Sequence, residues 1–159
     1  SIHFNAEDLG YMSQEVKDLL AASNWPGMNI LMFAFDPRED GEEKPEEFIE
    51  NSVCYTGTHD NTTLLGWLES LPDEILNSLK AYFNSEDPKV LAEKIIQEGE
   101  RSKSFLMVVP IQDWLGMGKE ARINTPGTSS GNWQWRLRSM DLLKSLAPRI
   151  KKTIGDRAQ

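Results

Sequence analysis

The sequence predicts an α/β fold in which parallel strands alternate with helices. Two runs, Asn29 to Phe35 and Phe105 to Ile111, are nearly continuous in apolar residues, a pattern typical of strands buried on both faces. Segments with helical periodicity separate the apolar runs, and strands that alternate with helices are joined by right-handed parallel crossovers. The length of 159 residues fits one domain or a large part of one.

The expected order of elements is β-α-β-loop-β-α-α-α-β-loop-α. The predicted strands are Ile2 to Ala6, Asn29 to Phe35, Ser52 to Tyr55 and Phe105 to Ile111. The predicted helices are Ser13 to Ala22, Thr62 to Leu71, Glu74 to Phe83, Pro88 to Ser102 and Met140 to Ile154. The expected helix caps are Ser13, then Asn61 or Thr62, and then Asp73. Pro88 is suited to open a helix, and Pro148 is expected to break or kink the last one.

Two long polar segments interrupt this pattern. Asp36 to Glu50 is too long and too charged for an ordinary connection. It is predicted to be either a solvated surface excursion or one wall of a substrate groove. Gly116 to Asn132 is rich in turn-forming residues and is predicted to be a loop.

Composition excludes several classes of function. A formal charge of −8 repels phosphate backbones, so we expect no nucleic-acid partner. Cys54, the single cysteine, excludes a disulfide framework and is predicted to be a buried thiol. We expect no metal or other cofactor, because neither histidine belongs to a ligand motif and no phosphate-binding loop is present. With no apolar run long enough to span a membrane and no signal peptide visible, we expect a cytoplasmic protein with no membrane partner.

Polar side chains follow each predicted strand, where active residues of α/β folds collect. Glu7 and Asp8 follow the first strand, Asp36 the second and Asp113 the fourth. The third strand is followed by the polar cluster Thr58-His59-Asp60-Asn61-Thr62. Surface turns and a helix cap are the simpler interpretation, but a cap requires neither His59 nor Asp60. Two carboxylates at strand ends of one barrel would suit glycoside chemistry.

The segment Arg122 to Arg136 joins small hydroxyl and amide residues to Trp133 and Trp135. A sugar ring stacks its C–H face on indole and needs directional partners for its hydroxyls. The alternative is that both tryptophans only pin the last helix onto the domain.

Five motifs in register resemble the C-terminal part of the 4-α-glucanotransferase family, also called amylomaltase or disproportionating enzyme. They are Ala6-Glu7-Asp8-Leu9-Gly10, Pro26-Gly27-Met28-Asn29-Ile30 with the apolar run after it, Tyr55-Thr56-Gly57-Thr58-His59-Asp60-Asn61-Thr62-Thr63, Pro110-Ile111-Gln112-Asp113-Trp114-Leu115-Gly116, and Ala121-Arg122-Ile123-Asn124-Thr125-Pro126-Gly127-Thr128 continuing to Gly131-Asn132-Trp133-Gln134-Trp135-Arg136. The resemblance covers nearly the whole chain.

The resemblance implies a fold and a chemistry. Residues 1–159 would be the C-terminal half of a catalytic (β/α)8 TIM barrel, about its last four βα units. The family passes α-1,4-glucan segments between maltooligosaccharides with retention. Glu7 then matches the general acid/base and Asp60 the carboxylate that stabilises the transition state. His59 matches a donor to sugar hydroxyls. Asn61 beside it is also expected to bind substrate, and Asn124, Pro126 and Gly127 match a loop that lines the glucan groove.

One departure from the family pattern affects the expected activity. The family's nucleophilic aspartate lies in an Arg-x-Asp-His-type motif, which does not occur in these 159 residues. Retaining chemistry needs that carboxylate, so we expect this chain alone to be inactive or nearly so. We also expect self-association through exposed sheet edges. The alternative functions are a glucan-binding module without catalysis and a purely structural or interaction domain.

Overall fold

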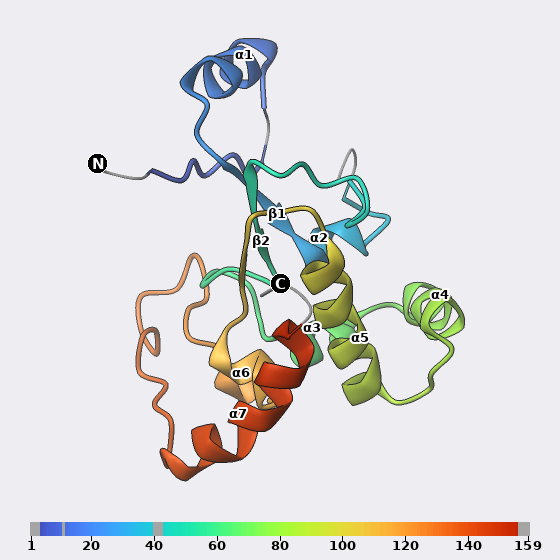
Figure 1. Cartoon of the computed structure of the whole chain (residues 1–159). Coiled ribbons are helices and arrows are strands. Elements are labelled where there is room, and N and C mark those ends of the chain that lie inside the picture. The colour runs from blue at the N-terminus through green and yellow to red at the C-terminus, as the bar shows by residue number, and fades with distance from the viewer. Residues whose placement is uncertain (1–3, 11, 40–42, 156–159) are drawn as a thin grey trace.

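A parallel three-stranded sheet lies at the centre of the computed structural model, which describes residues 4–10, 12–39 and 43–155. The elements in chain order are α1 (Gln14–Ser23), β1 (Gly27–Ile30), α2 (Leu31–Ala34), β2 (Ser52–Tyr55), α3 (Leu64–Ser70), α4 (Asp73–Phe83), α5 (Pro88–Arg101), β3 (Leu106–Val108), α6 (Ile111–Trp114), the 3-10 helix η1 (Lys119–Ala121) and α7 (Asp141–Ile154). The strand order is β1-β2-β3, with Ile30 opposite Tyr55 and Tyr55 opposite Val108. The predicted α/β class and the parallel pairing are confirmed (Figure 1).

The second predicted strand changes into a helix halfway along its length. β1 ends at Ile30, and Leu31–Ala34 form the helical turn α2, so the prediction of a strand through Phe35 is wrong. Leu31, Met32 and Ala34 are all buried, at 0%, 2% and 1% exposed. A fully buried apolar run has no polar face, and its periodicity therefore cannot distinguish a strand from a helix.

The first predicted strand is not formed in the described residues. Ile2 and His3 lie outside them, and residues 4–6 have no regular secondary structure. This segment nevertheless lies along the free edge of β1, because the amide of Ala6 donates to the Pro26 carbonyl at 2.9 Å. The next donor on β1, the amide of Met28, bonds to the Asp8 carboxylate at 2.8 Å. The Asp8 carboxylate thus accepts the hydrogen bond that a backbone carbonyl of a neighbouring strand would otherwise accept from Met28.

The last strand is shorter and more exposed than predicted. β3 covers Leu106–Val108, and Pro110, which has no amide hydrogen, precedes α6. Met107 packs against the core beside Gly99 of α5. Its neighbours Leu106 and Val108 therefore point to the opposite face of the sheet and are 47% and 39% exposed. The expectation that this strand is buried on both faces is wrong for the structure described.

Helix starts show which predicted caps are used. Ser13 takes the N-cap position of α1 without a side-chain bond, and Pro88 opens α5, as predicted. Thr63 caps α3 by accepting from the Gly66 amide at 3.1 Å, so the prediction of Asn61 or Thr62 is wrong. Asp73 is the first residue of α4 and not its cap. Pro148 lies inside α7, so the predicted break at this residue does not occur.

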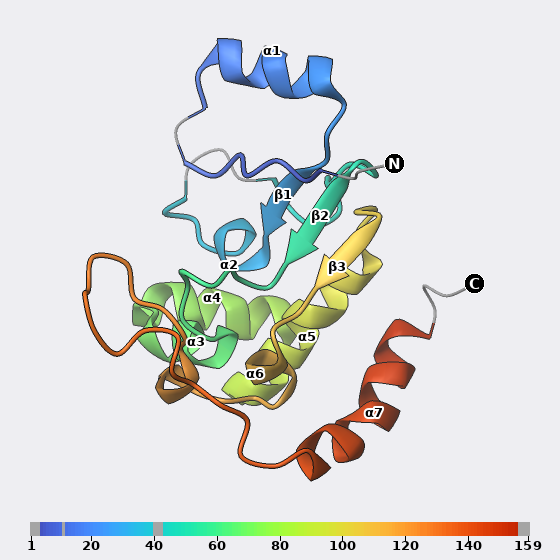
Figure 2. The ribbon, with the colours of Figure 1, turned by 90° about the vertical axis from the view of Figure 1, so that its left-hand side faces the viewer.

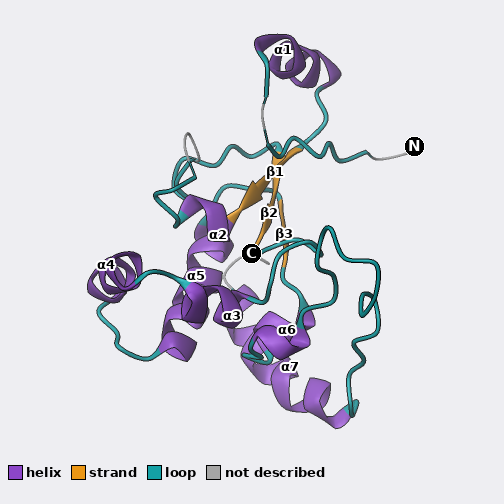
Figure 3. Ribbon diagram, turned by 180° about the vertical axis from the view of Figure 1, so that it is seen from behind, coloured by secondary structure: helices purple, strands orange, loops and turns teal. Residues whose placement is uncertain are grey.

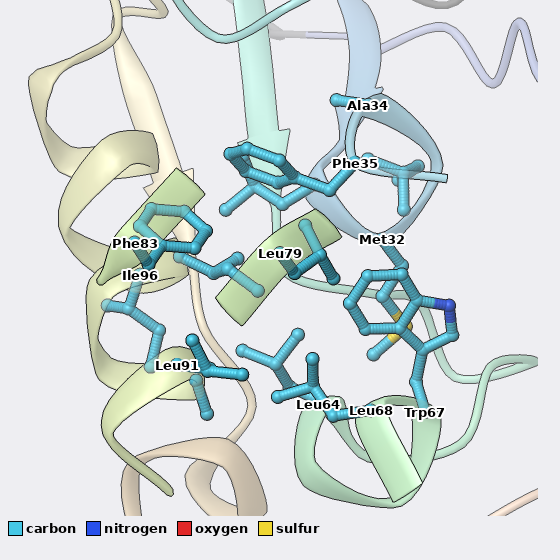
Figure 4. Close-up of a cluster of buried hydrophobic side chains, with 14 of the residues drawn as sticks. Met32, Ala34, Phe35, Leu64, Trp67, Leu68, Leu79, Phe83, Leu91 and Ile96 are labelled. Atoms are coloured by element: carbon cyan, nitrogen blue, oxygen red, sulfur yellow. The ribbon is translucent and has the colours of Figure 1, made fainter. Parts of the chain in front are cut away.

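The core lies between the sheet and helices α2 to α5 (Figures 2 and 4). Leu64 and Leu68 of α3 and Leu91 and Ile95 of α5 are 0% exposed. Cys54 is also fully buried, as predicted. The polar segment after α2 is anchored and not only solvated, since Phe48 is 2% exposed and the Lys44 ammonium donates to the Ala34 carbonyl. In the described residues, no helix is long and apolar enough to cross a membrane.

Candidate active site

A pocket of about 1080 Å³ opens at the carboxyl ends of the strands. Met12, Lys17 and Glu39 contribute to its wall, and most of the wall comes from four segments that are far apart in the sequence. They are Glu7 to Gly10, Gly57 to Thr63, Pro110 with Gln112 and Asp113, and Ala121 to Ile123. The topology of parallel strands brings these segments together, since equivalent ends of such strands meet at one edge of the sheet.

The loop Gly57–Thr63 after β2 carries most of the predicted polar cluster. Asn61 closes this loop, because its Oδ1 accepts from the amide and the hydroxyl of Thr58 at 2.8 and 2.9 Å. His59 and Asp60 therefore sit at the tip of a tight turn, and their side chains are each 52% exposed. Asn61 lines the pocket, but its side-chain oxygen already has partners.

Asp60 forms the centre of a hydrogen-bonded group. Its Oδ1 lies 3.3 Å from His59 Nε2 and accepts from Asn124 Nδ2 at 2.6 Å. Arg122 donates to the Asp60 carbonyl at 2.5 Å through Nη2 and to the Asn124 carbonyl at 2.7 Å through Nε. The guanidinium therefore joins the two loops. The sequence motif contains Arg122, but no residue pattern assigned this bridging role to it.

Figure 3 shows in teal the long loop that leads to α7, and this loop also brings an aromatic ring beside His59. The Trp133 ring lies 5.4 Å from the His59 ring, with 34° between their planes. Trp133 has φ +62°, a strained conformation for a bulky side chain, and its ring is 57% exposed. Its indole is therefore open to solvent beside His59 and is not buried against the last helix. Pro126 and Gly127 lie in an exposed turn outside the pocket wall.

Glu7 is exposed and lines the pocket between two anchored neighbours. Ala6 is bonded to Pro26 and Asp8 to Met28. The Asp8 carboxylate also lies so close to Gly27 that a Cβ there would come within 2.3 Å of Oδ2. Asp8 therefore has a structural role, whereas Glu7 is exposed in the pocket.

Two other carboxylates that follow predicted strands are buried, and both oxygens of each accept hydrogen bonds. Asp36 is 5% exposed and binds Arg38 Nε and Nη2 at 2.8 and 2.5 Å, and this pairing lowers the pKa of Asp36. Asp113 is also 5% exposed, and burial raises its pKa, although it accepts from Thr56 Oγ1 and the Leu64 amide. Position after a predicted strand therefore does not show whether a carboxylate is exposed in the pocket or buried with partners.

These opposite pKa shifts predict opposite effects of pH on the free energy of unfolding. Asp36, with a lowered pKa, stabilises the fold above its unfolded pKa of about 4, and this contribution is lost as pH falls through the folded pKa. Asp113, with a raised pKa, stabilises it below the unfolded pKa, and that contribution is lost as pH rises through the folded pKa.

Urea denaturation of the wild type, Asp36→Asn and Asp113→Asn over a range of pH measures both effects. As pH falls from 7 towards about 4, the wild type should gain stability relative to Asp113→Asn. Below about pH 4 it should lose stability relative to Asp36→Asn. Parallel curves for the three proteins would contradict the assignment of these shifts to the two carboxyls.

Comparison with known proteins gives one consistent result. Residues 1–142 match the family described as 4-alpha-glucanotransferase. A 4-alpha-glucanotransferase of Streptococcus pneumoniae is 40% identical over 133 residues, which cover 83% of this chain and 26% of that protein. The chloroplastic/amyloplastic 4-alpha-glucanotransferase of Solanum tuberosum is 35% identical over 95% of this chain and 26% of its own length.

The structure is similar to that of an amylomaltase from Streptococcus agalactiae solved in complex with acarbose. The TM-score is 0.82 at 33% identity, over 92% of this chain and 30% of the other. The chain therefore spans about a quarter to a third of the length of the proteins it matches.

Proposed function

Because the chain belongs to the 4-alpha-glucanotransferase family, we propose that it supplies part of the active site of an enzyme that transfers α-1,4-glucan segments between maltooligosaccharides with retention. The observation that carries the proposal is that Glu7 and Asp60, from segments far apart in the sequence, line one pocket with exposed side chains. Glycoside chemistry needs carboxylates on a shared sugar site.

Each residue of the site has a role in this proposal. Glu7 protonates the glycosidic oxygen and later takes a proton from the acceptor hydroxyl. Asp60, oriented by His59 and Asn124, stabilises positive charge at the reacting carbon. His59, Asn61 and Asn124 bind sugar hydroxyls, and Pro126 with Gly127 borders the glucan groove. Residues 1–159 form the C-terminal half of the catalytic TIM barrel, about its last four βα units. The proposed location of the protein is the cytoplasm.

The nucleophile of the retaining mechanism must come from outside these 159 residues in this proposal. Asp36 and Asp113 are buried with both oxygens engaged, and Asp8 holds the edge of β1. Asp60 is already assigned to stabilise the charge. The 159-residue chain alone should therefore not transfer glucan.

A maltotriose disproportionation assay, read as glucose release, tests the function. We expect release by a longer protein that includes the missing barrel strands, and none by the 159-residue chain. No transfer by the longer protein would refute the proposed activity. Transfer by the short chain would show that one of its own carboxylates acts as the nucleophile.

The exposed ring of Trp133 beside His59 favours a second candidate, a glucan-binding module without catalysis. Titrating the chain with maltoheptaose while following tryptophan fluorescence should give a saturable change. Trp133→Leu should abolish this change, whereas Trp25→Leu, at a ring stacked on Phe4, should preserve it. Saturation without glucan transfer by the longer protein would favour the module over the enzyme.

Self-association through the edge of the sheet is also proposed. Leu106 and Val108 leave an apolar face open on the edge strand β3, and such edges pair with other chains. Light scattering should therefore show an apparent mass that rises with concentration. The double variant Leu106→Lys, Val108→Lys should lower it, and Val90→Lys on the exposed side of α5 should not. A constant monomer mass at all concentrations would contradict the proposal.

A further inference from the structure

Asp113 contacts both ends of the loop that carries His59 and Asp60. Its Oδ2 accepts from the Thr56 hydroxyl at 2.5 Å, just before the loop begins. Its Oδ1 accepts from the Leu64 amide at 2.7 Å, just after the loop ends. A single carboxylate from the segment after β3 thus closes the loop Gly57–Thr63 on both sides.

Burial makes these two contacts hard to replace. Thr56 and Leu64 are 0% exposed, and Asp113 is 5% exposed. The Leu64 amide is the first of helix α3 and has no acceptor within that helix. If Asp113 were removed, both buried donors would need new acceptors, at a cost that favours movement of the loop.

The loop between these two points is also held at its tip. Asn61 closes the turn internally, and Arg122 and Asn124 hold Asp60 from the neighbouring loop. His59 and Asp60 themselves are half exposed. The neighbouring loop therefore holds Asp60 at the tip, and Asp113 holds the two ends of the loop.

We propose that Asp113 is a positioning residue, which sets the placement of His59 and Asp60 by holding both ends of their loop. The effect of Asp113 on glucan binding rests on the proposed function. The two contacts of Asp113 with Thr56 and Leu64, which we call the clamp, can be tested without a sugar. Asp113 acts through Thr56 and Leu64 and needs no contact with substrate.

Proton NMR of the imidazoles tests the clamp directly. The sequence has only two histidines, His3 and His59, so a His3→Gln variant assigns both sets of signals. All spectra are recorded at one pH, and the ring of Trp133 at 5.4 Å shifts the His59 resonances. Asp113→Ala should move the His59 signals to the positions of a free imidazole.

Two variants provide matched controls. In Asp113→Asn the amide oxygen can accept from Leu64 and the amide nitrogen can donate to the Thr56 hydroxyl, so the His59 signals should stay at their wild-type positions. Asp36→Ala removes an equally buried strand-end carboxylate that does not contact the loop, and it should also leave them unchanged.

Wild-type His59 signals in a folded Asp113→Ala protein would overturn the proposal, as would an equal change in Asp36→Ala. If Asp113→Ala does not fold, Thr56→Val removes only the contact at the β2 end. His59 signals that move in Thr56→Val support the clamp, and unchanged signals reject it.

Maltoheptaose affinity is measured separately, and it should fall in Asp113→Ala and persist in Asp113→Asn. A moved His59 signal in a chain that binds no maltoheptaose would refute the glucan-binding module and leave the clamp intact, whereas the proposed transfer activity is tested on the longer protein.

Discussion

Glu7→Gln should lower the rate of glucan transfer by about 10²- to 10⁴-fold in the longer protein that contains this chain, the usual contribution of a general acid/base. Glutamine keeps the size and hydrogen-bonding capacity of the side chain but cannot exchange a proton at neutral pH. Glu7 is exposed and its neighbours carry the contacts to β1, so the fold should not change. Initial rates of glucose release from maltotriose measure the effect.

Glu69→Gln is the matched control, because Glu69 is exposed on α3 and lies outside the pocket wall. Its rate should equal that of the wild type. Unfolding by urea should give the same midpoint for all three proteins. Full activity in Glu7→Gln would show that Glu7 is not the general acid/base and that another carboxylate has this role.

Leu68→Ala should lower the free energy of unfolding by about 2–5 kcal/mol, the range for a large-to-small change in a packed core. Leu68 is 0% exposed on α3, in the cluster shared with α5 (Figure 4). The cost combines the lost burial of the side chain with the cavity left behind. Urea denaturation followed by far-UV circular dichroism measures it.

Leu19→Ala makes the same substitution on α1, where Leu19 is 69% exposed and no residue is buried. Its effect should stay within about 0.5 kcal/mol. Similar losses for the two variants would mean that α1 is covered in solution, for example by another copy of the chain.

The sequence predicted the helices better than the strands. α4 and α5 carry apolar stripes, and Asp87 with Pro88 marks the start of α5 within the chain itself. The run Asn29 to Phe35 has no such internal signal. Whether Ile30 is followed by strand or helix depends on what packs around it, because both conformations bury an all-apolar segment equally well.

The sequence by itself also determined the family and the candidate site residues, because local motifs carry the side chains that chemistry needs. The prediction of roles for Glu7 and Asp60 remains to be tested. Only the tertiary structure decided which strand-end carboxylates are open: Glu7 and Asp60 are exposed, while Asp36 and Asp113 are buried with partners. Arg122 and Asp113 bind residues about fifty or more positions away. These contacts form only when the chain folds, because they join residues that are distant in the sequence. The local spacing of residues therefore does not predict them.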